Sequence, residues 1–377
     1  MLAKHFDSAK VFMAKTGLTL KYWNESWAYW NGSSYQGVTE GFVEYRVLQF
    51  LRETAEEGTW DLSSLRGLVR HLRLLCHSLH ESPPCWDDGD SMPKPRSLFA
   101  VKNGLLELCP APRLIPSTPR FFGFTATDYD YSKAARCPLW QNFLGSLWRK
   151  DRGYQRLLQE WFGYCLLADT SQQKILAIYG PPCSGKSTIA RILRGLIGRD
   201  NVACPSIRSL GSDFGLWALH KKLVAILPDA TLPRPCPAVE ECLKLVSGED
   251  AIDIQRKGIA SLSGMILPTR FVIVANEPPA LLDRSGALAR RLLILHTRTS
   301  HVGREDVRLT DRLLNELPGI LNWSIEGWKR LQERGHFEEP LSGEAEAIVE
   351  EPLSGEAEAI VSAMPDRKRI RRVIVEY

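Results

Sequence analysis

Residues 180–187 read Gly-Pro-Pro-Cys-Ser-Gly-Lys-Ser, and they lie between an apolar run at 175–179 and a segment whose apolar residues recur at helical spacing. They match the pattern G-x-x-x-x-G-K-[ST], whose glycines let backbone N–H groups turn inward around a polyphosphate at the positive end of the next helix. In that pattern the lysine reaches the β- and γ-phosphates and the serine ligates Mg²⁺. The alternative is a glycine-rich turn without nucleotide. The predicted phosphate-binding residues are Gly180, Pro181, Pro182, Cys183, Ser184, Gly185, Lys186, Ser187 and Thr188.

The composition is ordinary for a soluble globular protein of two or three domains, with 377 residues of which 44% are hydrophobic and 24% charged. A formal net charge of +4 does not by itself indicate nucleic-acid binding, which must therefore rest on local basic sites. The nine cysteines are scattered singly without a C-x-x-C pair, which favours a reducing cytoplasm and argues against structural zinc. No apolar stretch approaches the roughly 20 residues that span a bilayer, so we expect neither secretion nor a membrane partner.

The N-terminal half mixes strand and helix patterns. An aromatic, strand-like segment from Leu18 to Tyr35 leads into Asn31-Gly32, which predicts a hairpin with a type I′ turn. Aromatic residues at helical spacing between Pro138 and Leu167 are more typical of packing than of ligand contacts. These patterns predict helices at 40–55 and 61–80, two short strands around Asn103-Gly104, and two amphipathic helices within 138–167.

After Lys174 the sequence alternates apolar strands with helices, as an open parallel α/β sheet does. The predicted strands are 175–179, 223–227 and 271–275, with a further apolar run at 292–295 and a helix from near Pro318 to Gly335. Beyond that helix, Glu338–Val349 is repeated without change as Glu350–Val361. Two short acidic copies cannot stack into a solenoid, so we expect a solvated or partly helical tail. The basic run at 367–372 suits nucleic-acid contact and solubility equally.

Polar residues follow two of the predicted strands, at the edge where such sheets bind ligands. Asp229 follows the strand at 223–227 and is the candidate acid for holding Mg²⁺ or orienting water. Asn276 ends the strand at 271–275, where its amide could contact the γ-phosphate or the attacking water. The alternatives are a surface carboxylate at Asp229 and a turn-capping amide at Asn276.

Two pairs of cations are candidates for phosphate chemistry. Arg290 and Arg291 precede the run at 292–295 and suit an arginine finger, which offsets negative charge developing in a neighbouring subunit's site. Surface salt bridges are an equal alternative. Arg256 and Lys257 lie on a segment bounded by glycines, where they could follow single-stranded DNA by sequence-independent phosphate contacts. The alternative is a solvated charge pair.

These motifs, in this order, resemble the superfamily 3 helicases, and specifically the phage and plasmid primase-helicase family with its poxvirus-primase-like N-terminal region. The matching segments are 180–188 for motif A, 222–229 for motif B, 248–257 for motif B′ and 269–276 for motif C, with Arg291 as the finger. Upstream, residues 101–108, 137–140 and 158–164 resemble the region that precedes the helicase core. The similarity covers about residues 1–335.

The resemblance implies an ATPase that forms a homo-hexameric ring, binds ATP and Mg²⁺ between subunits, and unwinds forked DNA in the cytoplasm of a bacterial host. By position, it gives Asp229 the metal or water role, Asn276 the sensor role, Arg291 the finger in trans and Lys257 the DNA contact. Asp229 stands where relatives often have Glu. No primase catalytic domain precedes the core, so a separate primase or replication initiator is an expected partner.

The fold class we expect is α/β, an AAA+-like P-loop NTPase core with a central parallel sheet, preceded by a smaller mixed α+β N-terminal domain. Two other functions stay open: a P-loop ATPase that loads or remodels replication proteins without unwinding DNA, and a decayed prophage remnant that only binds nucleotide. The expected divisions are 1–135 (the N-terminal primase-helicase-associated domain), 136–170 (a helical linker or collar), 171–300 (the ATPase core), 301–337 (a helical segment) and 338–377 (the acidic tail, expected to be disordered, with its basic end).

Overall fold

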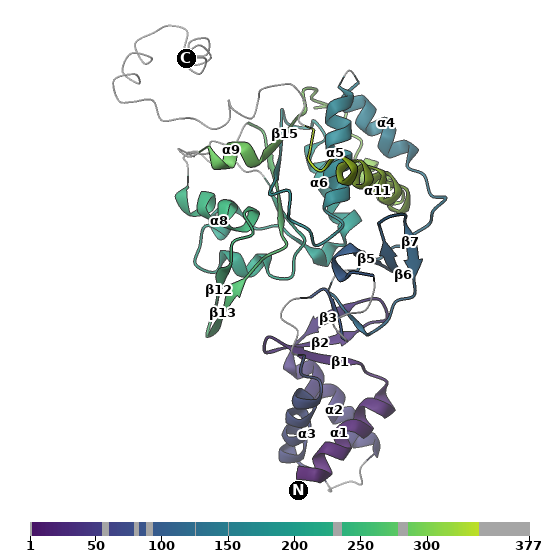
Figure 1. The fold of residues 1–377 in the computed structure, drawn as a ribbon, viewed down its shortest axis with the longest axis vertical. Helices are drawn as coiled ribbons and strands as arrows, with labels where there is room; N and C mark the ends of the chain where they lie inside the picture. The colour runs from purple at the N-terminus through teal and green to yellow at the C-terminus, as the bar shows by residue number, and fades with distance from the viewer. Residues whose placement is uncertain are drawn as a thin grey trace.

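The structure is a computed structural model that describes residues 2–54, 60–78, 83–87, 93–124, 126–149, 151–228, 236–277 and 286–338. Figure 1 shows that the N-terminal helices lie at one end of an elongated molecule and that the central sheet lies toward the other. The duplicated segments after Glu338 and the basic run at 367–372 lie outside the described residues. Within the described part of the chain, no helix is both long enough and apolar enough to cross a membrane.

The N-terminal segment packs three helices beside a three-stranded antiparallel sheet. Its elements are α1 (Leu2–Thr16), β1 (Leu20–Trp23), β2 (Ser26–Trp30), β3 (Tyr35–Val38), α2 (Glu40–Thr54) and α3 (Leu62–Leu75). Buried side chains such as Phe12, Val47 and Leu72 form one shared cluster. Because α3 has its apolar residues on one face, Leu65, Leu68, Val69 and Leu72 are buried while Leu74 is exposed.

The predicted hairpin at Asn31-Gly32 is present, but its loop differs from a two-residue turn. The loop spans residues 31–34 between β2 and β3, and the Asn31 side-chain oxygen closes it by accepting from the backbone N–H groups of Ser33 at 2.9 Å and Ser34 at 3.0 Å. A two-residue turn with positive φ lies one strand earlier, at Asn24 (φ 47°) and Glu25 (φ 59°). The side chain of Asn31 therefore serves the longer loop, and the tight turn uses a pair without glycine.

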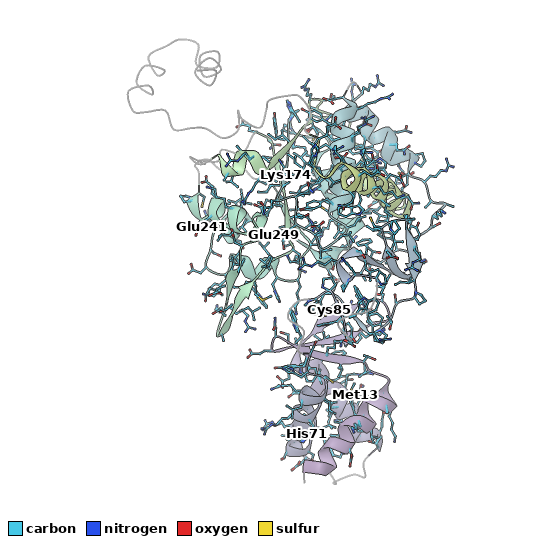
Figure 2. All side chains as sticks on the ribbon, viewed as in Figure 1. Met13, His71, Cys85, Lys174, Glu241 and Glu249 are labelled. Atoms are coloured by element: carbon cyan, nitrogen blue, oxygen red, sulfur yellow. The ribbon has the colours of Figure 1, made fainter. Side chains whose placement is uncertain are left out.

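Short strands connect this segment to the rest of the chain. They are β4 (Cys85–Trp86), which pairs with β8 (Phe121–Phe122), and the antiparallel set β5 (Leu98–Val101), β6 (Gly104–Glu107) and β7 (Arg113–Ile115). The turn between β5 and β6 is residues 102–103, one position before the predicted Asn103-Gly104, and Gly104 begins β6. Cys85 lies at the junction of the two ends of the molecule in Figure 2 and packs with Trp23 and Phe122.

A five-stranded parallel sheet forms the centre of the larger end. Its strands are β9 (Ile175–Tyr179), β10 (Val202–Ala203), β11 (Val224–Leu227), β14 (Arg270–Ala275) and β15 (Leu292–His296), in the order β10-β11-β14-β9-β15. The three apolar runs predicted as strands are present, and the further apolar run at 292–295 is also a strand, β15. Because β14 inserts between β9 and β11, the segments that follow β9 and β14 become neighbours at the carboxyl edge.

Helices cover both faces of the sheet. Successive side chains of a strand point to opposite faces, and both sets are apolar in β9, so each face packs against its own helical layer. Leu176 and Ile178 face one helical layer, and Ile175 and Ala177 face the other. The first layer contains α4 (Pro138–Leu147), α5 (Arg152–Tyr164), α6 (Lys186–Ile197), α10 (Leu309–Leu314) and α11 (Leu317–Arg334). The second contains α7 (Ile207–Leu210), the 3₁₀ turn η3 (Gly215–Leu219), α8 (Pro237–Ser247), α9 (Ala287–Arg291) and the hairpin of β12 (Ile252–Arg256) with β13 (Ile259–Met265).

Helices α5 and α11 approach closely along their backbones. A Cβ on Gly163 or on Gly327 would come nearer than 3.0 Å to a carbonyl oxygen of the opposing helix, so both positions require glycine. At the same contact, the carboxylate of Glu160 is 1% exposed and accepts from Arg330 at 2.7 Å and from Arg334. Helix α11 ends at Gly335 (φ 84°), the predicted position.

Candidate nucleotide-binding site

The loop of residues 180–185 joins the carboxyl end of β9 to α6, which is the local context that the sequence predicts. Gly180 has φ 148°, and a Cβ there would come nearer than 3.0 Å to the carbonyl oxygen of Thr297. Gly185 has φ 90° and precedes α6, and a Cβ there would lie 3.0 Å from the Phe143 ring. Both glycines are therefore required by backbone conformation and by close approach.

The ammonium group of Lys186 lies inside this loop. Its side chain is in the first turn of α6, is 5% exposed, and donates to the carbonyl oxygens of Gly180 and Pro181, both at 2.7 Å, and to Ser184 Oγ at 3.3 Å. These three acceptors all belong to the loop. The positive end of α6 and the ammonium group together make this loop suited to an anion.

The other loop residues divide between exposed and buried positions. Ser187 is exposed at the start of α6, so its hydroxyl is accessible to a metal ion, while Thr188 is half-buried. Pro181 and Pro182 lack a backbone N–H, so after Gly180 the next N–H donor of the loop is that of Cys183. Partial desolvation and the neighbouring Glu305 carboxylate raise the pKa of the Cys183 thiol. The thiol is therefore neutral near pH 7 and adds no negative charge to the loop.

Residues after β15 brace the loop, and sequence reasoning did not identify them. The Thr297 hydroxyl is buried and lies 2.6 Å from Ser184 Oγ, while its backbone N–H donates to Tyr179 O at 2.8 Å. Ser300 Oγ donates to Pro182 O at 2.8 Å, and the His301 N–H donates to Cys183 O at 3.0 Å. The only sequence signal was that Thr297 follows an apolar run, as Asn276 does.

Asn276 lies beside the loop because of strand register. Ala275 of β14 pairs with Tyr179 of β9, so the next residues, Asn276 and Gly180, stand at the same edge of adjacent strands. Asn276 is exposed there. Asp229 lies outside the described residues; the strand that precedes it, β11, is the neighbour of β14 and runs parallel to it.

The two candidate finger residues differ in their surroundings. Arg291 is half-buried, and its guanidinium donates to Lys244 O at 2.5 Å and to Ser247 Oγ at 2.9 Å, so it caps the C-terminal end of α8 in the same chain. Arg290 is exposed, and its carbonyl oxygen accepts from Lys174 Nζ at 2.7 Å. Figure 2 labels Lys174 beside the sheet. Arg290 is thus the more accessible of the two guanidinium groups.

The two candidate DNA-binding cations also separate. Lys257 is exposed in the turn between β12 and β13, next to Gly258 at φ 72°. The Arg256 side chain is only 6% exposed, donates from Nε to Ala260 O at 2.7 Å, and lies 3.5 Å from the carboxylate of Glu25 in the N-terminal segment. Lys257 is therefore accessible to a polyanion, and Arg256 supports the hairpin.

Comparisons with known proteins place this chain among related folds. Residues 178–291 match a family model described as a family of unknown function (DUF5906). Three solved structures of the C-terminal region of NrS-1, all described as apo forms, are similar at 16% identity. Two of them cover 95% of this chain and 77% of the other, with TM-scores of 0.57 and 0.61, and the third covers 90% and 72% with a TM-score of 0.56. At this identity the similarity concerns the fold, which spans both ends of this molecule.

Proposed function

We propose that this chain is an ATP-dependent DNA helicase of phage, plasmid or prophage replication. In this proposal, a ring of identical subunits hydrolyses ATP at its interfaces, moves along single-stranded DNA and unwinds duplex in the cytoplasm of a bacterial host. The observation that carries it is the buried Lys186 ammonium inside a loop between β9 and α6, with Asn276 and Thr297 at the same sheet edge. NrS-1, whose C-terminal region has a similar fold, is a phage primase-helicase.

The residues around the loop fit a nucleoside triphosphate and Mg²⁺. Lys186 would exchange its two carbonyl acceptors for phosphate oxygens, since a charge-assisted bond to phosphate is stronger than one to a neutral carbonyl. The exposed hydroxyl of Ser187 and the carboxylate of Asp229 would hold Mg²⁺, which neutralises charge on the transferred phosphoryl group. Asn276 would orient the attacking water from the neighbouring strand end.

We assign the finger role to Arg290 in preference to Arg291. A finger must reach a phosphate across a subunit interface, and Arg291 would first have to leave the carbonyl and hydroxyl that it contacts on α8. Arg290 precedes it on α9 and is exposed. Arg291 would then act by fixing α9 against α8.

Lys257 would contact the DNA backbone from the tip of the β12–β13 hairpin, while a separate primase or replication initiator would supply priming.

Strand displacement on a forked duplex, run beside Lys186→Ala, tests the proposal. Unwinding by the parent protein that disappears in the variant supports a helicase. ATP hydrolysis that single-stranded DNA does not stimulate favours a remodelling ATPase instead, and nucleotide binding without any turnover favours a decayed remnant. In Lys257→Ala, the ratio of DNA-stimulated to basal hydrolysis should fall.

A further inference from the structure

A cleft separates the N-terminal sheet from the ATPase core, at the opposite edge of the central sheet from the phosphate loop. Its volume is about 470 Å³, and its walls include Trp27 and Thr39 on one side and Trp217, His220, Lys221 and Lys222 on the other. Residues 220–222 immediately precede β11, so they lie at its amino end. A strand of this length places them roughly 15 Å from the carboxyl edge.

Aromatic rings form a continuous stack at the cleft. The imidazole of His220 stacks on Trp23 at 6.0 Å with an interplanar angle of 7°, and on Trp217 at 5.0 Å with an angle of 16°. Trp217 is 43% exposed, an unusual degree of exposure for such a large apolar ring. The exposed part of the Trp217 ring is therefore accessible to a further planar group, beside the Arg256 guanidinium that lies 6.0 Å from the ring centroid.

The cleft also carries positive charge. Lys221 has a positive φ of 62°, and its ammonium group lies 4.3 Å from the Phe124 ring centroid and 5.1 Å from that of Trp23. Within the described ranges, no carboxylate pairs with it, and burial together with Lys222 lowers the pKa of Lys221 to about 8. Lys222 donates to the Asp200 carbonyl oxygen at the same wall.

A further cation lies at the Trp217 end of the stack. Arg256 lies 3.5 Å from the carboxylate of Glu25, and its guanidinium lies 6.0 Å from the Trp217 ring centroid. Arg256 is followed in sequence by Lys257 at the hairpin tip. The base of the hairpin therefore places one cation against the exposed Trp217 ring.

We propose that this cleft binds single-stranded nucleic acid, with one base stacked on Trp217 and a backbone phosphate on Lys221. An exposed ring at the end of an aromatic stack, and an ammonium group that pairs with no carboxylate of the described residues, are the two kinds of group that sequence-independent binding of single strands uses. A volume of about 470 Å³ suits a unit of one or two nucleotides. The choice of nucleic acid as ligand rests on the proposed function, but the site is separate from the phosphate loop and from Lys257.

Fluorescence anisotropy of a labelled oligo-dT of about 15 nucleotides, with the full chain at low salt and without ATP, tests the cleft. Trp217→Ala should weaken binding by about five- to 150-fold, the range of base–aromatic stacking. Lys221→Met should reduce the slope of log affinity against log salt by about 0.7. The matched controls are Tyr45→Ala, an aromatic residue 57% exposed on α2, and Lys133→Met, an exposed lysine. If Trp217→Ala and Lys221→Met bind like these controls, the proposal is overturned.

A second measurement does not depend on the stability of the variants. Ultraviolet cross-linking to an oligonucleotide that contains 5-iodo-deoxyuridine should give adducts on peptides with Trp217; adducts confined to residues 252–265 overturn the proposal. Polyglutamate at the same total charge should not displace the oligo-dT. If it does, the cleft recognises negative charge alone, and the choice of nucleic acid as ligand is overturned. If the parent protein hydrolyses no ATP but its oligo-dT affinity still depends on Trp217, the cleft proposal stands while the helicase proposal fails. If the parent protein unwinds DNA but Trp217→Ala and Lys221→Met leave the DNA affinity unchanged, the cleft proposal alone is overturned.

Discussion

Gly180→Ala should destabilise the phosphate loop much more than an alanine at another glycine of positive φ. Gly180 has φ 148°, where an alanine stores about 1–3 kcal/mol of backbone strain, and its Cβ would collide with the Thr297 carbonyl oxygen, which adds about 1–3 kcal/mol of overpacking. The midpoint of thermal unfolding should then fall by about 2–4 °C for each kcal/mol, or about 6–12 °C in total for a loss of 3 kcal/mol. Binding of a fluorescent ATP analogue should fall with it, since the loop backbone can no longer close around phosphate.

Gly303→Ala is the matched control, because Gly303 also has a positive φ, 78°, but has no atom within 4 Å of an added Cβ. Its cost should be about 1 kcal/mol, from the left-handed backbone alone. Circular dichroism of both variants during heating gives the two midpoints under one set of conditions. If Gly180→Ala unfolds within about 2 °C of Gly303→Ala, the close approach of Gly180 to Thr297 does not stabilise the fold as argued.

Three further predictions concern buried or capping groups. Burial and nearby cations lower the pKa of His220 from 6.5 to about 4, so on acidification the unfolded state binds a proton before the folded state does. The free energy of unfolding should therefore fall by up to about 3 kcal/mol as the pH drops from 6.5 to 4. His220→Phe should lack this loss, as urea unfolding at the two pH values would show. Arg291→Ala should lower stability by about 1.5–3 kcal/mol through its contacts on α8, whereas exposed Arg290→Ala should change it by less than about 0.5 kcal/mol, as calorimetry would show. Glu160→Ala leaves two arginines of α11 without their carboxylate and should lower the free energy of unfolding in urea by about 3–5 kcal/mol; an unchanged midpoint would contradict this ion-pair assignment.

The central sheet could be predicted from the sequence because its strands are buried on both faces. Such strands are continuous apolar runs, and β9, β11, β14 and β15 all fall on runs of this kind. The two-residue strand β10 carries no comparable signal, since Val202–Ala203 is strand only through its pairing with β11. The order of the strands is likewise absent from any local pattern, because it depends on which distant segments pair.

The candidate site was predictable where its chemistry is local. The loop at 180–187 is one motif, and Asn276 is a polar residue directly after a buried strand. Thr297 has the same position after β15, but threonine is common in strands, and only the pairing of His296 with Tyr179 shows that it meets the loop. Arg291 caps a helix whose contacted residues lie 44 and 47 positions earlier in the chain, a separation that no spacing rule encodes.

The loop of residues 180–185 and the proposed DNA cleft lie at opposite edges of the central sheet, and β11 runs from the cleft to the edge that carries the loop. Residues 220–222 line the cleft before β11 begins, and Asp229 follows where β11 ends. All four residues of β11 are buried and pair with β14, and Val224 and Ala225 also pair with β10, so the strand has little freedom to deform and a displacement at one end is carried to the other. Any coupling through it is reciprocal: the factor by which nucleotide changes DNA affinity equals the factor by which DNA changes nucleotide affinity. Under the proposed function, DNA bound in the cleft would shift the carboxyl end of β11, which precedes the proposed metal ligand Asp229 in the sequence, without touching the loop of residues 180–185. This gives a physical route by which single strands would control hydrolysis.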